Sequence, residues 1–160
     1  MDKVYLIGFM GTGKTAIGRH LQTRYDVEEL DERFVQEYGS ITDFFAKYGE
    51  TGFRDREIEL LRNSEAEIVI TGGGIIERLE NRTLMQESGL IIWIDTPFHL
   101  VWNRIRTDPS RPLVKSRMTV EKLFRRRRPV YARLANIRLD GTKTVRELAK
   151  EIESILEENV

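Results

Sequence analysis

A glycine-rich pattern near the start of the chain constrains the fold more than any other feature. It reads GFMGTGKT at positions 8–15, after an apolar run at 4–7 that predicts a buried strand and before apolar residues at helical spacing. Glycines in such a loop let backbone N–H groups point inward, and the following helix adds the positive end of its dipole. The order of strand, glycine loop and helix therefore predicts a cradle for phosphate groups.

Each fixed position of this loop has a chemical role. We expect Lys14 to reach the terminal phosphates of a nucleotide and the Thr15 hydroxyl to bind Mg²⁺. The alternative is a glycine turn with an incidental lysine, and the surrounding strand and helix argue against it. The loop residues that we expect to bind ATP are Gly11, Thr12, Gly13, Lys14, Thr15 and Ala16.

The composition limits what else the chain can be. Its 160 residues, 40% hydrophobic and 32% charged, suit a single globular domain spanning 1–160. The 26 Lys and Arg balance 26 Asp and Glu, so no net charge attracts nucleic acid or an anionic membrane. The lack of cysteine excludes disulfides, thiolate metal sites and a cysteine nucleophile. With no charged leader and no apolar run of membrane-spanning length, we expect a soluble, cytoplasmic protein. We also expect it to be a monomer.

The rest of the chain alternates strand and helix patterns, which predicts an α/β fold with a mainly parallel sheet covered on both faces. Ligands in such folds bind at the carboxyl ends of the strands, where the loop at 8–15 and a glycine turn at 72–74 both lie. The predicted strands lie at 4–7, 27–30, 68–71, 90–95 and 137–139. The predicted helices lie at 14–24, 31–39, 41–49, 53–61, 97–105, 119–128 and 144–156, with a loop at 107–118.

Three of these helices carry specific boundary signals. Ser40 is a predicted N-cap, and Gly49 is predicted to stop the helix that follows it. Thr96 and Pro97 are predicted to cap and start a helix, and 144–147 matches a capping box. The phosphate loop alone is compatible with an ATPase, a GTPase switch, a transport ATPase or a small-molecule kinase. The chain has no NKxD or DxxG guanine-nucleotide motif, which argues against a GTPase switch. The other motifs of the chain are needed to choose among the remaining functions.

Six motifs, in order across residues 4–135, resemble those of the shikimate kinase family. They are GFMGTGKT at 8–15, the acidic pair Glu29 and Asp31, Gly49-Glu50 with Phe53-Arg54, TGGG at 71–74, RPL at 111–113 and RRPVY at 127–131. GKT occurs in many families, whereas the combination of FR, GGG, RPL and RxPxY is far more selective.

The resemblance implies a nucleoside-monophosphate-kinase-like fold, which is a three-layer α/β sandwich with a five-stranded parallel sheet flanked by helices. It also implies a substrate-binding helical region at about 31–62 and a mobile lid at about 107–118. The implied reaction is transfer of the ATP γ-phosphoryl group to the 3-hydroxyl of shikimate, with Mg²⁺, in aromatic amino-acid (chorismate) biosynthesis.

By the same resemblance, Arg54 and Arg127 bind the shikimate carboxylate and Asp31 holds the ring hydroxyls. A hydroxy acid does need guanidinium donors at one end and a carboxylate acceptor at the other. From the residues alone, Arg54 also fits a surface arginine, and Asp31 fits a simple helix-start residue. The glycines of TGGG also fit a tight turn. The implied substrate-binding set is Asp31, Arg54, Gly72, Gly73, Gly74 and Arg127.

The expected catalytic residues are Lys14, Asp31 and Arg111. We expect Asp31 mainly to orient the acceptor hydroxyl and secondly to accept its proton, because phosphoryl transfer depends chiefly on positioning and charge. Arg111, in the implied lid, would cover the phosphates. Arg104 matches a family position near the nucleotide, and Lys143 lies in a loop expected beside adenine.

Glu29 departs from the family pattern. The family usually has Asp-x-Asp after the second strand, and Glu29 stands at the position associated with Mg²⁺. Glutamate is also a hard oxygen ligand but is longer by one methylene, so we expect it to act through water. The predicted metal-binding residues are therefore Thr15 and Glu29.

Two further alternatives concern function. Four arginines at 125–128 suggest RNA binding in isolation, but the neutral chain favours a helix with one inward arginine and three solvated ones. Besides shikimate kinase, two functions remain open: another small-molecule or nucleotide kinase of the same fold, and a nucleotide-gated binding module with little turnover.

Overall fold

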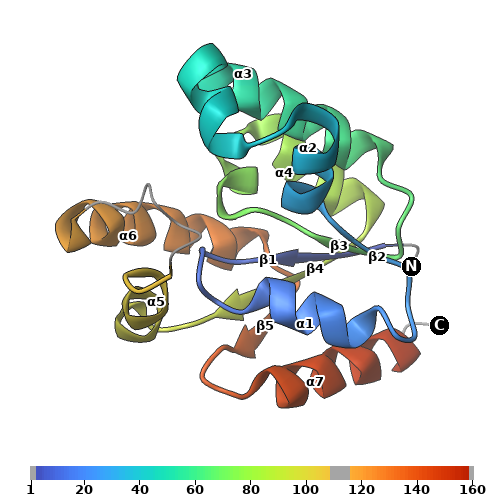
Figure 1. Ribbon diagram of the computed structural model, residues 1–160. Helices are drawn as coiled ribbons and strands as arrows, with labels where there is room; N and C mark the ends of the chain where they lie inside the picture. The colour runs from blue at the N-terminus through green and yellow to red at the C-terminus, as the bar shows by residue number, and fades with distance from the viewer. Residues whose placement is uncertain (1–2, 109–115, 159–160) are drawn as a thin grey trace.

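The computed structural model describes residues 3–108 and 116–158, and its centre is a parallel sheet between two layers of helices (Figure 1). The five strands run in the order β2-β3-β1-β4-β5, and every pairing is parallel. They are β1 (Val4–Ile7), β2 (Val27–Glu29), β3 (Ile68–Ile70), β4 (Leu90–Asp95) and β5 (Ile137–Asp140). The predicted α/β fold with a five-stranded parallel sheet is confirmed.

The middle strand, β1, shows why the sheet is buried on both faces. Its Tyr5 and Ile7 belong to a hydrophobic cluster on one face, and its Val4 and Leu6 belong to a second cluster on the other. Successive side chains of a strand point to opposite faces, so burial on both faces requires an unbroken apolar run. The sequence VYLI meets that requirement with four buried residues.

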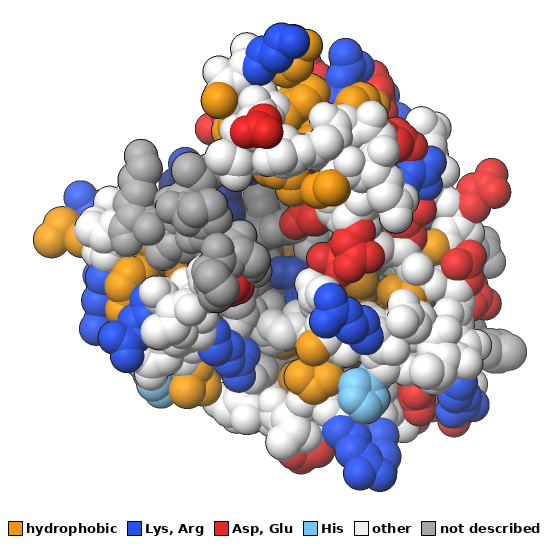
Figure 2. Space-filling view, viewed as in Figure 1, with side chains coloured by type: hydrophobic (Ala, Val, Ile, Leu, Met, Phe, Trp, Pro, Cys, Tyr) orange, Lys and Arg blue, Asp and Glu red, His pale blue; other side chains and the backbone are white. Residues whose placement is uncertain are grey.

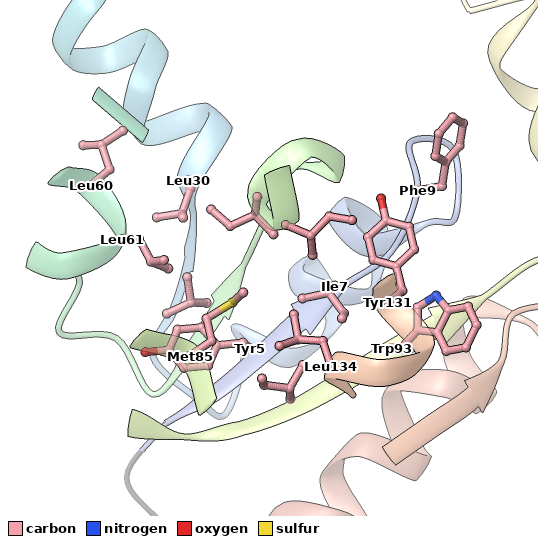
Figure 3. Close-up of a cluster of buried hydrophobic side chains, with 14 of the residues drawn as sticks. Tyr5, Ile7, Phe9, Leu30, Leu60, Leu61, Met85, Trp93, Tyr131 and Leu134 are labelled. Atoms are coloured by element: carbon pink, nitrogen blue, oxygen red, sulfur yellow. The ribbon is translucent and has the colours of Figure 1, made fainter. Parts of the chain in front are cut away.

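Helices cover each face of the sheet. The face of Tyr5 and Ile7 packs mainly against α2, α3, α4 and α6, and the opposite face packs against α1 and α7 (Figure 1). Figure 3 shows part of the first cluster, with Met85 of α4 close to Tyr5. The helices are α1 (Lys14–Leu21), α2 (Leu30–Tyr38), α3 (Ile41–Asn63), α4 (Leu79–Ser88), α5 (Phe98–Ile105), α6 (Arg117–Leu134) and α7 (Val145–Glu158), and a short 3-10 helix is η1 (Gly73–Glu77). No helix among the described residues is both long and apolar enough to cross a membrane.

Several predicted helix boundaries are confirmed. The Ser40 side chain accepts a hydrogen bond from the backbone N–H of Asp43, as an N-cap does. Gly49 has φ 73° and interrupts α3, so the predicted stop is a kink between two helical halves. At the start of α7, Thr144 Oγ1 accepts from the N–H of Glu147, and Glu147 Oε1 accepts from the N–H of Thr144, which completes the capping box.

The predicted boundaries of α6 were wrong at both ends. The helix starts at Arg117 because Ser116 caps it, accepting from the N–H of Thr119. It also continues through Pro129 to Leu134, beyond the predicted end near Arg128. A proline inside a helix removes one backbone hydrogen bond, but the buried side chains of Tyr131 and Leu134 hold the last turn against the sheet.

Other local predictions also need correction. Helix α1 ends at Leu21, three residues before the predicted end, and α2 starts at Leu30, inside the predicted second strand. Thr96 does not cap α5, which begins at Phe98 without a side-chain cap, and Thr96 Oγ1 is buried without a partner among the described residues. The glycines at 72–74 lead into η1 rather than a simple turn, and α4 was not predicted.

Candidate active site

The loop between β1 and α1 has the backbone of an anion cradle. Gly11 and Gly13 have φ of 78° and 93°, a region that favours glycine. Thr12 Oγ1 donates to the carbonyl of Phe9 at 3.0 Å and so closes the loop on itself. Gly13 is the N-cap of α1 and offers no side-chain cap, so the N–H groups of the first turn, which includes Thr15 and Ala16, are left for a ligand.

Lys14 lies against the inside of this loop. Its side chain is buried, and its ammonium group donates to the carbonyl oxygens of Gly8 and, at 3.0 Å, Phe9. Both acceptors belong to the loop itself. The positive charge is therefore held beside the N-terminus of α1, where it adds to the attraction for an anion.

Two of the other predicted nucleotide residues lie near the loop. Arg104 of α5 donates through Nη1 to the carbonyl of Gly11 at 3.0 Å. Lys143 lies in the loop before α7, where its ammonium pairs with Glu151, which raises the pKa of Lys143. The same end of α7 reaches the cradle, because a Cβ at Gly13 would lie 3.9 Å from Val145 Cγ2. Arg111 and most of the predicted lid lie outside the described residues.

The two predicted metal residues are in direct contact. Thr15 Oγ1, in the first turn of α1, donates to Glu29 Oε1, at the end of β2, at 2.8 Å. Burial raises the pKa of Glu29, although the hydrogen bond from Thr15 acts in the opposite direction. No group of three or more His, Cys, Asp or Glu side chains within 3–108 and 116–158 is arranged to hold a metal ion. A hydroxyl and a carboxylate beside a phosphate cradle nevertheless match Mg²⁺, which commonly takes one or two protein oxygens together with phosphate and water.

The glycines at 72–74 approach three of the predicted substrate residues, one each. A Cβ at Gly72 would lie 3.0 Å from Asp31 Oδ1, and one at Gly73 would lie 3.4 Å from Arg127 Nη1. At Gly74 it would lie only 2.1 Å from Arg54 Nη2. A side chain at position 74 would displace the guanidinium group, so glycine there allows Arg54 to occupy its observed position.

Arg54 is a buried member of α3 and is only 8% exposed. Its Nη1 donates to Glu57 Oε1 at 2.9 Å, one turn along the same helix. The guanidinium also lies 5.1 Å from the ring centre of Phe53. Its Nε lies 3.7 Å from Glu50 Oε1 and is buried without a hydrogen-bond partner in the described part of the chain. Its Nη2 is the nitrogen nearest to Gly74.

Arg127 is the inward member of the four consecutive arginines on α6. It is 7% exposed, whereas the side chains of its three neighbours are exposed, as the sequence predicted. Its Nε lies 3.7 Å from Glu77 Oε1, and within the described residues that nitrogen has no hydrogen-bond acceptor. Two buried guanidinium groups therefore approach one glycine turn through their Nη atoms, and such a pair is suited to binding a carboxylate.

The cradle and the glycine turn adjoin each other. A Cβ at Gly73 would lie 3.4 Å from the backbone nitrogen of Met10, inside the phosphate loop. The space-filling view shows a hollow on this side of the molecule, between the upper helices and α1, with acidic and basic side chains at its border (Figure 2). The geometry brings an anion cradle and a carboxylate site side by side, as transfer of a phosphoryl group between two ligands requires.

Two residues of this region were given no function of their own in the sequence analysis, although Tyr131 ends the RRPVY motif. Glu57 is 3% exposed and balances the charge of Arg54. Tyr131 donates through its hydroxyl to the carbonyl of Gly73 at 2.6 Å, and burial raises its pKa, so it holds the glycine turn. An i,i+3 spacing of Arg54 and Glu57 was visible in the sequence, but such pairs are usually exposed.

The burial of Glu57 generates a pH prediction. Burial raises the pKa of Glu57 above its ordinary value of 4.5, against the opposing effect of Arg54. A carboxyl whose pKa is raised by folding stabilises the folded state below its unfolded pKa, and this contribution is lost as the pH rises through the folded pKa. The free energy of unfolding of the parent should therefore fall, relative to Glu57→Gln, as the pH rises above about 4.5, by at most about 1.4 kcal/mol per pH unit.

Urea unfolding of both proteins between about pH 4 and pH 8 measures this difference. Glu59→Gln is the matched control, because Glu59 pairs with Arg56 at the same helical spacing but is exposed. Parallel pH profiles for the parent and Glu57→Gln would contradict the prediction.

Comparisons with known proteins agree with this geometry. The sequence model of the family described as shikimate kinase matches residues 10–157. A shikimate kinase of Sulfurihydrogenibium sp. (strain YO3AOP1) is 36% identical over 160 residues, which cover 95% of this chain and 96% of that protein. One of Bacillus cereus (strain AH187) is 38% identical, with 99% of this chain and 100% of that protein covered. The solved structure of shikimate kinase from Acinetobacter baumannii in complex with shikimate matches with a TM-score of 0.90 and 31% identity, covering 99% of this chain and 94% of that one. The chain therefore belongs to the shikimate kinase family.

Proposed function

We propose that this chain transfers the γ-phosphoryl group of ATP to the 3-hydroxyl of shikimate, giving shikimate 3-phosphate and ADP in aromatic amino-acid biosynthesis. The observation that carries the proposal is the meeting of Asp31, Arg54 and Arg127 at the glycines 72–74, directly beside the phosphate loop. The two arginines match a carboxylate, Asp31 matches hydroxyl groups, and the phosphate loop matches a phosphoryl donor. Family membership supports the same substrates.

At the carboxylate end, Arg54 and Arg127 bind the acid group of shikimate. Glu57 fixes Arg54 at 2.9 Å, so its guanidinium group is already oriented before the substrate arrives. The three glycines leave room for the ligand between these side chains and the backbone. Binding between two buried cations makes charge the main element of specificity.

At the hydroxyl end, Asp31 accepts hydrogen bonds from the ring hydroxyls and orients the one that reacts. The oxygen of that hydroxyl forms a bond to the γ-phosphorus as the bond to the ADP oxygen breaks, and its proton passes to the Asp31 carboxylate. Lys14 and the N–H groups at the start of α1 stabilise the charge that develops on the phosphoryl oxygens.

The nucleotide side uses the loop residues 11–16, with Arg104 and Lys143 at its border. Thr15 and Glu29 would hold Mg²⁺, and the ion supplies charge neutralisation between the phosphates when it is bound. We further assign 8–15 to the phosphate loop, about 31–62 to substrate binding and about 107–118, with Arg111, to the lid of one kinase domain.

Release of ADP, measured with ATP alone and then with shikimate and other hydroxy acids, tests the proposal. Release that depends on shikimate supports it. Release that depends on a different acceptor points to another kinase of this fold, and little release under any condition points to a nucleotide-gated binding module.

Arg54→Ala tests recognition of the carboxylate. Removing one partner of a buried hydrogen-bonded charge pair costs about 2 to 5 kcal/mol, so kcat/KM for shikimate should fall by roughly 30-fold to several thousand-fold. Shikimate methyl ester, which keeps the hydroxyls and loses the charge, should be a poor substrate of the parent. In Arg54→Ala the preference for the acid over the ester should shrink, because part of the carboxylate site is gone.

The measurement is a double cycle of kcat/KM, parent and variant against acid and ester, with folding checked by circular dichroism. Arg56→Ala is the control: it breaks a pair with Glu59 on the same helix, but that pair is exposed. An identical acid-to-ester ratio in the parent and Arg54→Ala means that Arg54 does not recognise the carboxylate.

Glu29→Gln tests the proposed support of Mg²⁺. If Glu29 helps to hold the ion, the Mg²⁺ concentration for half-maximal rate should rise, by roughly tenfold for a residue at or just beyond the ligand sphere. Glu28→Gln is the control, because Glu28 precedes it on β2 but pairs with Arg33 instead. An unchanged Mg²⁺ titration in Glu29→Gln would exclude Glu29 from the surroundings of the metal.

A further inference from the structure

We propose that Arg128 is a positioning residue for shikimate binding, because its ion pair with the buried Asp95 fixes the helical turn that presents Arg127. The inference rests on the proposed role of Arg127 in binding the substrate carboxylate. Arg128 itself contacts Asp95 and Trp93, whereas Arg127 approaches the glycine turn. Arg128 is the neighbour of Arg127 on α6 and points to another part of the molecule.

Asp95 is the anchor of this arrangement. It is the last residue of β4, and its side chain is 6% exposed. Its Oδ2 accepts from Arg128 Nη2 at 3.0 Å and from Arg138 Nε, on β5, at 2.7 Å. The two arginine side chains are 49% and 58% exposed, but the buried carboxylate depends on them for its solvation, which favours both contacts. The contact with Arg128 thus joins α6 to the end of the central sheet.

An aromatic pair supports the same contact. The guanidinium groups of Arg128 and Arg138 lie 5.4 Å and 6.0 Å from the ring centre of Trp93. Trp93 also stacks on Tyr131, one turn further along α6, with ring centres 6.2 Å apart, and Figure 3 shows the two rings together. Cations over an indole ring gain further attraction. Arg128 is therefore held both by a charge and by a ring that is fixed in the core.

Arg127, by contrast, has weak restraints of its own. Oε1 of Glu77 lies 3.7 Å from its Nε, which is beyond a normal hydrogen bond. Its guanidinium group also lies 6.0 Å from the ring centre of Phe9, and it interacts with the buried hydroxyl of Tyr131, whose pKa it acts to lower. Because Tyr131 belongs to the same helix, this contact moves with α6, and the position of the guanidinium group follows the position of the helix.

That backbone is weakened at this point. Pro129 lies inside α6 and has no N–H to donate to the carbonyl of Arg125, so the turn that contains Arg127 lacks one hydrogen bond. On one flank, Arg126 pairs with Glu77 at 2.9 Å, but the Arg126 side chain is 64% exposed and such pairs hold weakly. On the other flank, the buried partner of Arg128 provides the stronger lateral restraint.

The test is Arg128→Ala, assayed as the complete chain with ATP and shikimate. We expect KM for shikimate to rise about tenfold with kcat changed by less than about twofold, since residues of one contact network couple to this extent. Arg138→Ala is the matched control: it also leaves Asp95 with one arginine and Trp93 with one cation, but it lies on β5. It should lower the melting temperature by a similar amount and leave KM unchanged.

The double variant separates positioning from general destabilisation. If Arg128 acts through Arg127, Arg127→Ala/Arg128→Ala should have the same KM for shikimate as Arg127→Ala. If KM rises equally in Arg128→Ala and Arg138→Ala, or if the effects of Arg127→Ala and Arg128→Ala multiply in the double variant, the inference is overturned. If Arg127→Ala raises KM and Arg128→Ala does not, only this inference fails. If Arg127→Ala itself leaves KM unchanged, the proposed substrate role of Arg127 fails first.

Discussion

The close approach of backbone to side chains at residues 72–74 is the constraint on which the rest of the site depends. Gly74 leaves no room for a Cβ beside Arg54, and Gly72 leaves little beside Asp31. Because β3 ends there, the central sheet determines where this strip of backbone lies relative to the phosphate loop that follows β1. Helices α2, α3 and α6 then each place one side chain, Asp31, Arg54 and Arg127 respectively, beside this strip of backbone.

The positive charges of Arg54 and Arg127 are both buried in the site, and the glutamates that balance them lie at different distances. Arg54 has a buried glutamate at 2.9 Å, so its charge is balanced locally. Arg127 has a more distant one at 3.7 Å, so more of its charge is left for a ligand. A substrate carboxylate therefore completes a set of contacts that the folded chain provides only in part, which favours binding of an anion over a neutral molecule.

The sequence was sufficient for much of this fold because its signals are local. The apolar run of β4, the interruption of helix at Gly49 and the capping box of α7 each depend on neighbouring residues. All three were predicted, although the interruption at Gly49 was predicted as a helix end and is a kink. The resemblance supplied the site residues, and the structure brings most of them together. Contacts between distant elements could not be predicted: Arg128 and Asp95 are 33 positions apart, and Tyr131 and Gly73 are 58 apart. Periodicity shows which face of a helix is apolar, but not which strand end or loop that face will meet.

The arrangement of α6 has a consequence for how the family's sequences can change in length. Arg126, Arg127 and Arg128 contact Glu77, the glycine turn and Asp95, respectively, because successive residues of a helix are turned by about 100°. Inserting or deleting one residue between Arg128 and Tyr131 would rotate the arginines relative to Tyr131, and either Arg127 or Tyr131 would leave Gly73. Substitutions on the exposed side of this helix are compatible with the site, but a one-residue gap in an alignment here marks a protein that binds its acceptor differently.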